Sequence, residues 1–226
     1  MISLHLEERQ TQVLYDKKWL KFLKRAKLFK FIPFIDFVFG AGSLALGNVQ
    51  LNSDFDVLIG ARHGRIFSAR FFCVAVFGLF GLARMRLDHG GSSRDKVCFN
   101  HFVTQNAYKL SPPYTNSWKE LYKNLVPIYG ESEQINYFWK TNSEWMGVRK
   151  EWGDDLRYVD KSSLPKKILE NLLSGVVGDV CEAGLKYVQI KKIERSLTAS
   201  KLGYKPRIVY NNNELEFHPD RRKFGK

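Results

Sequence analysis

The chain has 226 residues, 44% of them hydrophobic and 14% aromatic, which is enough to bury a core in one domain or in one domain with an appendage. Its formal net charge of +13 favours a polyanionic partner, nucleotide or RNA first, although a solvated lysine-rich surface gives the same charge. Three widely spaced cysteines, Cys73, Cys98 and Cys181, exclude a disulfide framework and a zinc-ligand spacing. Residues 1–10 contain no apolar signal segment, so we expect a cytoplasmic protein.

The first predicted elements are a helix over residues 7–30, which Pro33 ends, and a strand over Phe34–Phe39. Apolar residues follow one face of this helix, and lysines and arginines occupy the others. The basic faces have two interpretations. We favour a solvated surface over a packed apolar face, and a dedicated RNA-binding helix is the alternative.

A glycine-serine turn and a pair of aspartates follow this strand. The turn is Gly40-Ala41-Gly42-Ser43, and a second β-prone run, D-F-D-V-L-I, begins at Asp54. Residues two apart in a strand point to the same face, so we expect Asp54 and Asp56 side by side. Neighbouring carboxylates raise each other's pKa, and Mg²⁺ between them relieves the repulsion. Glycine N–H groups approach an anion closely, which suits the turn to phosphate.

The order G-S, ten residues, then D-x-D on a strand resembles the signature of the polymerase-β-like nucleotidyltransferase superfamily. The segments S-L-A-L-G-N and S-D-F-D-V-L-I resemble a little-characterised prokaryotic branch of it. The resemblance implies an α+β fold with a short mixed sheet flanked by helices. It also implies Mg²⁺ or Mn²⁺ on Asp54 and Asp56, with a nucleoside triphosphate held near Gly42, Ser43 and Ser53.

The next segment is an apolar helix expected between Ile66 and Arg86. Its core, residues 71–83, is flanked by arginines and shorter than the roughly 20 apolar residues that span a bilayer. We therefore expect a buried helix on the sheet and no membrane insertion, with a membrane-associated protein as the alternative. Arg65 and Arg70 lie at the start of this helix, where each either contacts the triphosphate or is a surface charge.

Residues 96–104 form the next predicted strand. In the superfamily a third carboxylate on a neighbouring strand usually completes the metal site, and the matching position here is Asn100. Asparagine offers a carbonyl oxygen to a cation but cannot act as a base. Asp88 and Asp95 are the other possible third ligands. His101 is expected on the opposite face of a regular strand, packed rather than catalytic.

The rest of the chain is predicted to be mainly helical. Short helices are expected over residues 117–125 and 132–139, with a connecting loop over 140–160. A long helix is expected from Ser163 to Leu197, and a small hairpin in the tail after Pro206. The apolar stripe of the long helix, expected to be buried, consists of Ile168, Leu172, Val176 and Val180.

We therefore predict a nucleotidyltransferase domain over residues 1–140, with its basic helix, and a packed carboxy-terminal helical region with a basic tail over residues 141–226. The first functional hypothesis is an enzyme that moves an NMP from an NTP to a hydroxyl of RNA, a protein or a small molecule. The second is a catalytically weak nucleotide- or RNA-binding module on the same fold, because the third acid is missing. The sequence does not identify a partner protein.

Overall fold

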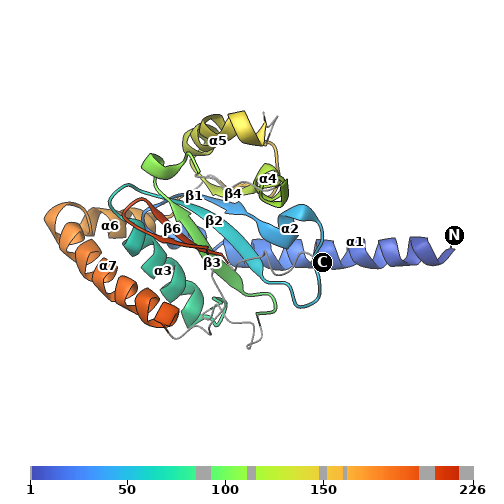
Figure 1. Cartoon of the computed structure of the whole chain (residues 1–226), viewed down its shortest axis with the longest axis horizontal. Helices are drawn as coiled ribbons and strands as arrows, with labels where there is room; N and C mark the ends of the chain where they lie inside the picture. The colour runs from blue at the N-terminus through green and yellow to red at the C-terminus, as the bar shows by residue number, and fades with distance from the viewer. Residues whose placement is uncertain are drawn as a thin grey trace.

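A computed structural model describes residues 2–84, 93–110, 116–147, 152–159, 162–198 and 207–218. These residues form a mixed α+β structure in which helices cover both faces of one six-stranded sheet (Figure 1). The α-helices are α1 (Ile2–Ala26), α2 (Gly42–Leu46), α3 (Ile66–Leu79), α4 (Asn116–Lys123), α5 (Ser132–Met146), α6 (Leu164–Leu172) and α7 (Gly175–Thr198). The strands are β1 (Ile35–Gly40), β2 (Phe55–Ala61), β3 (Val97–Val103), β4 (Val126–Gly130), β5 (Arg207–Tyr210) and β6 (Glu214–His218). Short 3-10 helices are η1 (Phe29–Phe31) and η2 (Gln105–Ala107).

The sheet has the strand order β4-β1-β2-β3-β6-β5. Strands β2 and β3 are parallel, and the other neighbouring pairs are antiparallel. Parallel neighbours need a crossover connection, which α3 provides between β2 and β3. The predicted α+β class with a short mixed sheet is therefore confirmed, and the start of β2 lies in the middle of the sheet.

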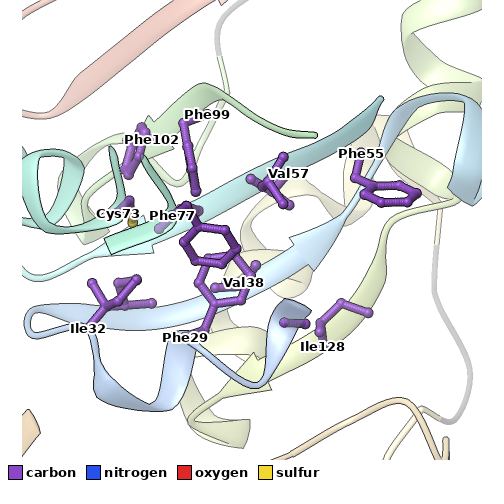
Figure 2. Close-up of a cluster of buried hydrophobic side chains, with 14 of the residues drawn as sticks. Phe29, Ile32, Val38, Phe55, Val57, Cys73, Phe77, Phe99, Phe102 and Ile128 are labelled. Atoms are coloured by element: carbon purple, nitrogen blue, oxygen red, sulfur yellow. The ribbon is translucent and has the colours of Figure 1, made fainter. Parts of the chain in front are cut away.

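The larger hydrophobic core fills the space between the sheet and helices α1 and α3. Figure 2 shows its centre, where Phe29 and Phe77 pack with ring centroids 4.9 Å apart, next to Phe99 and Phe102 of β3. Phe55 and Val57 of β2 point into this core, as the alternation of the D-F-D-V segment predicts. Their burial leaves the neighbouring aspartates to face the other side of the sheet.

The second core lies on that other side, under α4 and α5 (Figure 1). Phe37 and Phe39 of β1 pack there against Phe138 of α5, with ring centroids 5.5 and 5.3 Å from it. Tyr108 completes this aromatic group with no exposed surface. The two cores fix the sheet between helices, so strand positions near the site are held from both faces.

Two elements differ from the sequence-based expectation in the middle of the chain. Residues 126–130, where Pro127 and Gly130 indicated only a break, form the edge strand β4. An edge strand tolerates proline because one side of it makes no ladder hydrogen bonds. Helix α5 continues to Met146, so the expected loop over 140–160 starts later and the expected boundary at residue 140 falls inside a helix.

The expected long helix is two helices, separated at Leu173 and Ser174. Gly175 has a φ of +62°, which suits glycine and turns the chain between α6 and α7. Ser163 caps α6 as predicted, accepting a hydrogen bond from the Lys166 N–H. The expectation that the apolar stripe is buried is wrong. The exposed fractions are 50% for Ile168, 66% for Leu172, 78% for Val176 and 68% for Val180.

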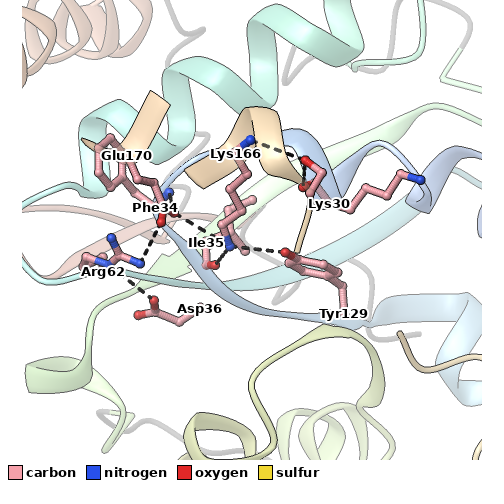
Figure 3. A network of polar contacts seen from close by, with 9 residues as sticks. Lys30, Phe34, Ile35, Asp36, Arg62, Tyr129, Lys166 and Glu170 are labelled. Atoms are coloured by element: carbon pink, nitrogen blue, oxygen red, sulfur yellow. Dashed lines mark hydrogen bonds and ion pairs between the residues drawn. The ribbon is translucent and has the colours of Figure 1, made fainter. Parts of the chain in front are cut away.

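Helix α6 is instead anchored to β1 through polar groups (Figure 3). The Lys166 ammonium donates to the Ile35 carbonyl at 2.6 Å and to the Tyr129 hydroxyl at 3.2 Å. The Glu170 carboxylate accepts from the Phe34 N–H at 2.7 Å. Burial lowers the pKa of Lys166, although the Glu170 carboxylate opposes this shift. These contacts place α6 against the sheet without the apolar stripe.

The predicted tail hairpin exists as β5 and β6, and it is part of the main sheet. Strand β6 pairs with β3, with His101 opposite Glu216 and Phe102 opposite Leu215. Leu215 and Phe217 enter the larger core.

Among the described residues, no helix has the length and apolar character that crossing a membrane requires. In α3, buried Phe67 and Cys73 face the core while Phe71 is 44% exposed.

Candidate functional site

The two aspartates of the D-x-D segment meet at the start of β2. Asp56 is the second residue of the strand, and Asp54 lies just before it. Carboxylate oxygens of Asp54 and Asp56 and the Cys98 sulfur all lie within 4.8 Å of one another. The structure thus brings the two predicted metal ligands together and adds Cys98, which is opposite Asp56 on β3.

The glycine turn closes over this pair from the end of β1. The Ala41 N–H donates to the Asp56 carbonyl at 2.9 Å, which fixes the turn against β2. Gly42 has a φ of +64°, and a Cβ at this position would overlap the Asp56 carboxylate. Only glycine fits both the conformation and the close approach. Gly42 therefore lies where the sequence places it, directly beside the acids.

Asn100 also reaches the site. Its side-chain Nδ2 donates to Asp56 Oδ1 at 3.1 Å. The prediction that Asn100 lies beside Asp56 holds, but the amide nitrogen faces the carboxylate, where a metal ligand would present its oxygen. In this arrangement the amide stabilises the ionised carboxylate and supplies no negative charge for a second cation.

His101 does not point away from Asn100 as a regular strand would require. On β3, Cys98 is opposite Asp56 and His101 is opposite Leu58, so between these pairs two residues of β3 lie against one residue of β2. This irregularity turns both side chains toward the face that carries α4. His101 is nevertheless packed, as expected, because it is 3% exposed and hydrogen-bonded to neighbouring side chains.

Arg84 is the residue that the sequence interpretation missed. It follows α3, its N–H donates to the Val97 carbonyl at 2.9 Å, and its guanidinium forms an ion pair with Asp54. Burial lowers the pKa of Arg84, but attraction to the carboxylates of Asp54 and Asp56 helps to outweigh this and the pKa is raised overall. The available signal was the charge imbalance of the acid pair, which requires a nearby cation.

The Cys98 thiol is kept neutral by the same surroundings. Burial raises its pKa, and the negative charges of Asp56 and Asp54 raise it further. A protonated thiol is a poor metal ligand, and Mg²⁺ prefers oxygen. Cys98 therefore packs beside the acid pair without adding to its charge.

The two serines lie close by in the chain, with different local roles. Ser43 is in the first turn of α2, where its carbonyl accepts from the Asn48 N–H at 3.1 Å. The Ser53 hydroxyl accepts from the Gln50 N–H at 2.9 Å and stabilises the loop that leads into Asp54. The Ser53 carbonyl accepts from the Lys18 ammonium at 2.8 Å.

Arg65 and Arg70 contact the carboxy-terminal helices. Arg65 forms an ion pair with Asp179 at 2.7 Å, and Arg70 donates to Gln189 at 2.8 Å. Arg65 also lies past the far end of β2, and a seven-residue strand spans roughly 20 Å. The structure therefore does not bring Arg65 to the aspartates, and it uses Arg70 to hold α7.

Asp95 is held in a separate cluster. Its carboxylate pairs with the ammonium groups of Lys18 at 2.8 Å and Lys21 at 2.5 Å. Burial raises the pKa of Asp95, but these two lysines outweigh it and lower the pKa overall. The side chains of this cluster border a hollow of about 730 Å³, which Lys17 and Arg94 also line. Asp88, the other suggested third ligand, lies outside the described residues.

Comparisons of the chain with protein-family models, curated proteins and solved structures return no match. The chemistry of the site must therefore be argued from its own groups. Two carboxylates share one small region with a guanidinium, a neutral thiol and an amide donor. Such a set can hold a hard cation on Asp54 and Asp56 once Arg84 releases Asp54.

Proposed function

We propose that the protein is a Mg²⁺-dependent nucleotidyltransferase that moves an NMP from an NTP to a hydroxyl acceptor. The observation that carries the proposal is the meeting of Asp54 and Asp56 beside the Gly42 turn. A pair of adjacent carboxylates is suited to a divalent cation, and a glycine turn, whose N–H groups can approach an anion closely, is suited to phosphate. The resemblance of the G-S and D-x-D segments to the polymerase-β-like superfamily supports the same assignment.

The donor set fits the proposed ion. Asp54 and Asp56 offer hard oxygen ligands for Mg²⁺ or Mn²⁺, and the triphosphate would complete the coordination. Gly42 and Ser43 are the proposed phosphate-binding positions, with Ser53 positioning the loop that carries Asp54. Arg65 and Arg70 are not part of this proposal, because their contacts are to α7.

In the proposed reaction the acceptor hydroxyl oxygen forms a bond to the α-phosphorus. The bond from the α-phosphorus to the bridging oxygen breaks, and pyrophosphate leaves. The hydroxyl proton goes to water or to a base of the acceptor, since Asn100 cannot take it. Bound Mg²⁺ would neutralise phosphate charge and orient the reacting groups. General-base catalysis contributes about 10²–10⁴-fold, so its loss predicts slow transfer.

A nucleotide- or RNA-binding module with weak catalysis is the second candidate. The specific observations that favour it are the Asn100 amide donating to Asp56 and the Arg84 guanidinium paired with Asp54. These contacts let the acid pair persist without a metal. RNA, a protein and a small molecule remain the proposed classes of acceptor or ligand.

The test uses the purified full chain with each of the four NTPs labelled at the α-phosphate, with Mg²⁺ or Mn²⁺, and with cell RNA or protein as acceptor. We expect label transfer that Asp56→Asn abolishes and that Asp154→Asn, an exposed matched control, leaves unchanged. Nucleotide binding measured by calorimetry separates the two candidates: binding without transfer supports the module. Equal nucleotide affinity in wild type and Asp56→Asn at matched Mg²⁺ overturns the assignment of the metal and nucleotide site to Asp54 and Asp56.

A further inference from the structure

A second cluster of metal-ligating groups lies at the join between β3 and the tail hairpin. His101 of β3 is opposite Glu216 of β6, and Glu214 is two positions earlier on the same strand. Opposite residues, and residues two apart, share a sheet face. Ligand atoms of all three side chains lie within 4.8 Å of one another, and His101 Nε2 is 3.2 Å from Glu214 Oε1.

The imidazole is oriented from behind by Tyr122 of α4. The Tyr122 hydroxyl lies 2.9 Å from His101 Nδ1, and Tyr122 is itself only 3% exposed. This bond occupies one ring nitrogen and turns the other, Nε2, toward the two carboxylates. Metal-binding histidines are typically fixed this way, through a hydrogen bond from the ring nitrogen that does not bind the metal.

The two carboxylates are held in place by the backbone and by burial. Asn211 Oδ1 accepts from the N–H groups of Asn213 and Glu214, each at 2.8 Å, which fixes the turn at the start of β6. Thr104 binds the same turn from the end of β3, with its hydroxyl 3.0 Å from Asn213 Oδ1. Glu216 is 1% exposed, so its carboxylate lies inside the protein.

We propose that His101, Glu214 and Glu216 bind a divalent transition metal, with Zn²⁺ the best match to one imidazole and two carboxylates. Three protein ligands with a fourth position open to water are an ordinary arrangement for Zn²⁺. A divalent ion balances the two carboxylates and joins β6 to β3. This site is separate from the Asp54–Asp56 pair and does not depend on the proposed transferase activity.

The test titrates chelator-treated full chain with Zn²⁺ alone, followed by thermal unfolding, and with Co²⁺ alone, followed by visible absorption. We expect one ion at this site per chain, a rise in the unfolding temperature, and Co²⁺ bands without thiolate charge transfer. Glu216→Gln should remove both responses, and Tyr122→Phe should weaken binding about 10–100-fold. The exposed control Glu133→Gln and the separate-site variant Asp56→Asn should keep both responses.

If Glu216→Gln does not fold, Glu214→Gln gives the same test at a less buried carboxylate. Three outcomes overturn the proposal. They are no stoichiometric binding by the wild-type chain, equal binding by the wild type and the Glu214 or Glu216 variant, and loss of the response in Asp56→Asn.

Discussion

The most informative single residue is Arg84, because its guanidinium places a positive charge beside the Asp54–Asp56 pair. Two neighbouring aspartates repel each other unless a cation lies between them, and this repulsion is the main physical reason to expect a metal. The ion pair with Asp54 shows that the chain supplies its own cation. A metal at this site must therefore compete with a guanidinium as well as with water, and the two states should be distinguishable by removing Arg84.

Arg84→Gln should lower the free energy of unfolding in the presence of a chelator. A hydrogen-bonded charged contact contributes roughly 1–3 kcal/mol, and Arg84 is only partly exposed. Adding Mg²⁺ should then stabilise the variant more than the wild type, because the ion replaces the missing charge. Urea unfolding with and without Mg²⁺ measures both effects, with the exposed Arg9→Gln of α1 as control. Equal Mg²⁺ effects in variant and wild type contradict the metal assignment.

Gly42 and Gly47 provide a matched pair for testing the close approach at the site. Both have positive φ, +64° and +78°, but a Cβ meets the Asp56 carboxylate only at Gly42, with nothing within 4 Å at Gly47. Alanine at either position should cost about 1–2 kcal/mol of backbone strain. Gly42→Ala should cost more and should also weaken nucleotide binding in calorimetry. Equal effects of the two variants on stability and binding would mean that Asp56 moves aside freely.

Asp36 gives a pH prediction away from the site. Burial raises its pKa from 3.8 to about 6, which Arg62 partly opposes. The raised carboxyl pKa does not lower the free energy of unfolding below pH 3.8. Its full destabilising effect, about 3 kcal/mol for a difference of two in pKa, is present above pH 6. Asp36→Asn should therefore gain stability relative to wild type as pH rises from about 4 to 6, and no further above that range. Urea unfolding across this range, with Asp154→Asn as control, checks the sign.

At the scale of elements, local patterns predicted the site and missed the long-range contacts. The D-F-D-V alternation predicts the strand and its buried face, and Gly42 is placed by the turn that precedes it. Strand β4 was missed because Pro127 excludes a central strand, and only the sheet order reveals an edge. The irregular pairing of β3 that turns His101 could not be predicted, since it depends on the neighbouring strand.

The exposed apolar stripe of α6 and α7 shows the same limit of prediction from local sequence patterns. Helical spacing of apolar residues predicts burial, but in this chain α6 is attached through Lys166 and Glu170. Ile168→Lys should therefore change the free energy of unfolding by less than about 0.5 kcal/mol, as at other surface positions. Phe77→Ala in the core of α3 should cost about 3–5 kcal/mol. Denaturant unfolding compares them, and a large loss in the Ile168 variant would show that the stripe is covered.

At the scale of the whole molecule, the sheet joins parts of the chain that the sequence separates. The tail was predicted to be a small hairpin in a carboxy-terminal region, yet β6 pairs with β3 in the centre of the fold. His101 of β3 contacts Glu214 of this hairpin, and Asn100 beside it contacts Asp56. The last strands therefore help to fix β3, on which the candidate site depends.

Leu215→Ala tests whether the hairpin belongs to the cooperative unit. Leu215 is fully buried in the larger core, so its truncation should cost about 2–5 kcal/mol of the global free energy of unfolding. The loss should appear as one transition, seen equally by tryptophan fluorescence and by circular dichroism, because the hairpin unfolds with the sheet. Val209→Ala on the outer strand β5 should cost less, since Val209 is only half-buried. If Leu215→Ala melts the hairpin in a separate early transition and leaves the main one unchanged, the tail is an appendage. Amide exchange would then be faster than in the wild type in β3 at Phe102 and Val103, which pair with β6, and unchanged in β1, which pairs with β2 and β4.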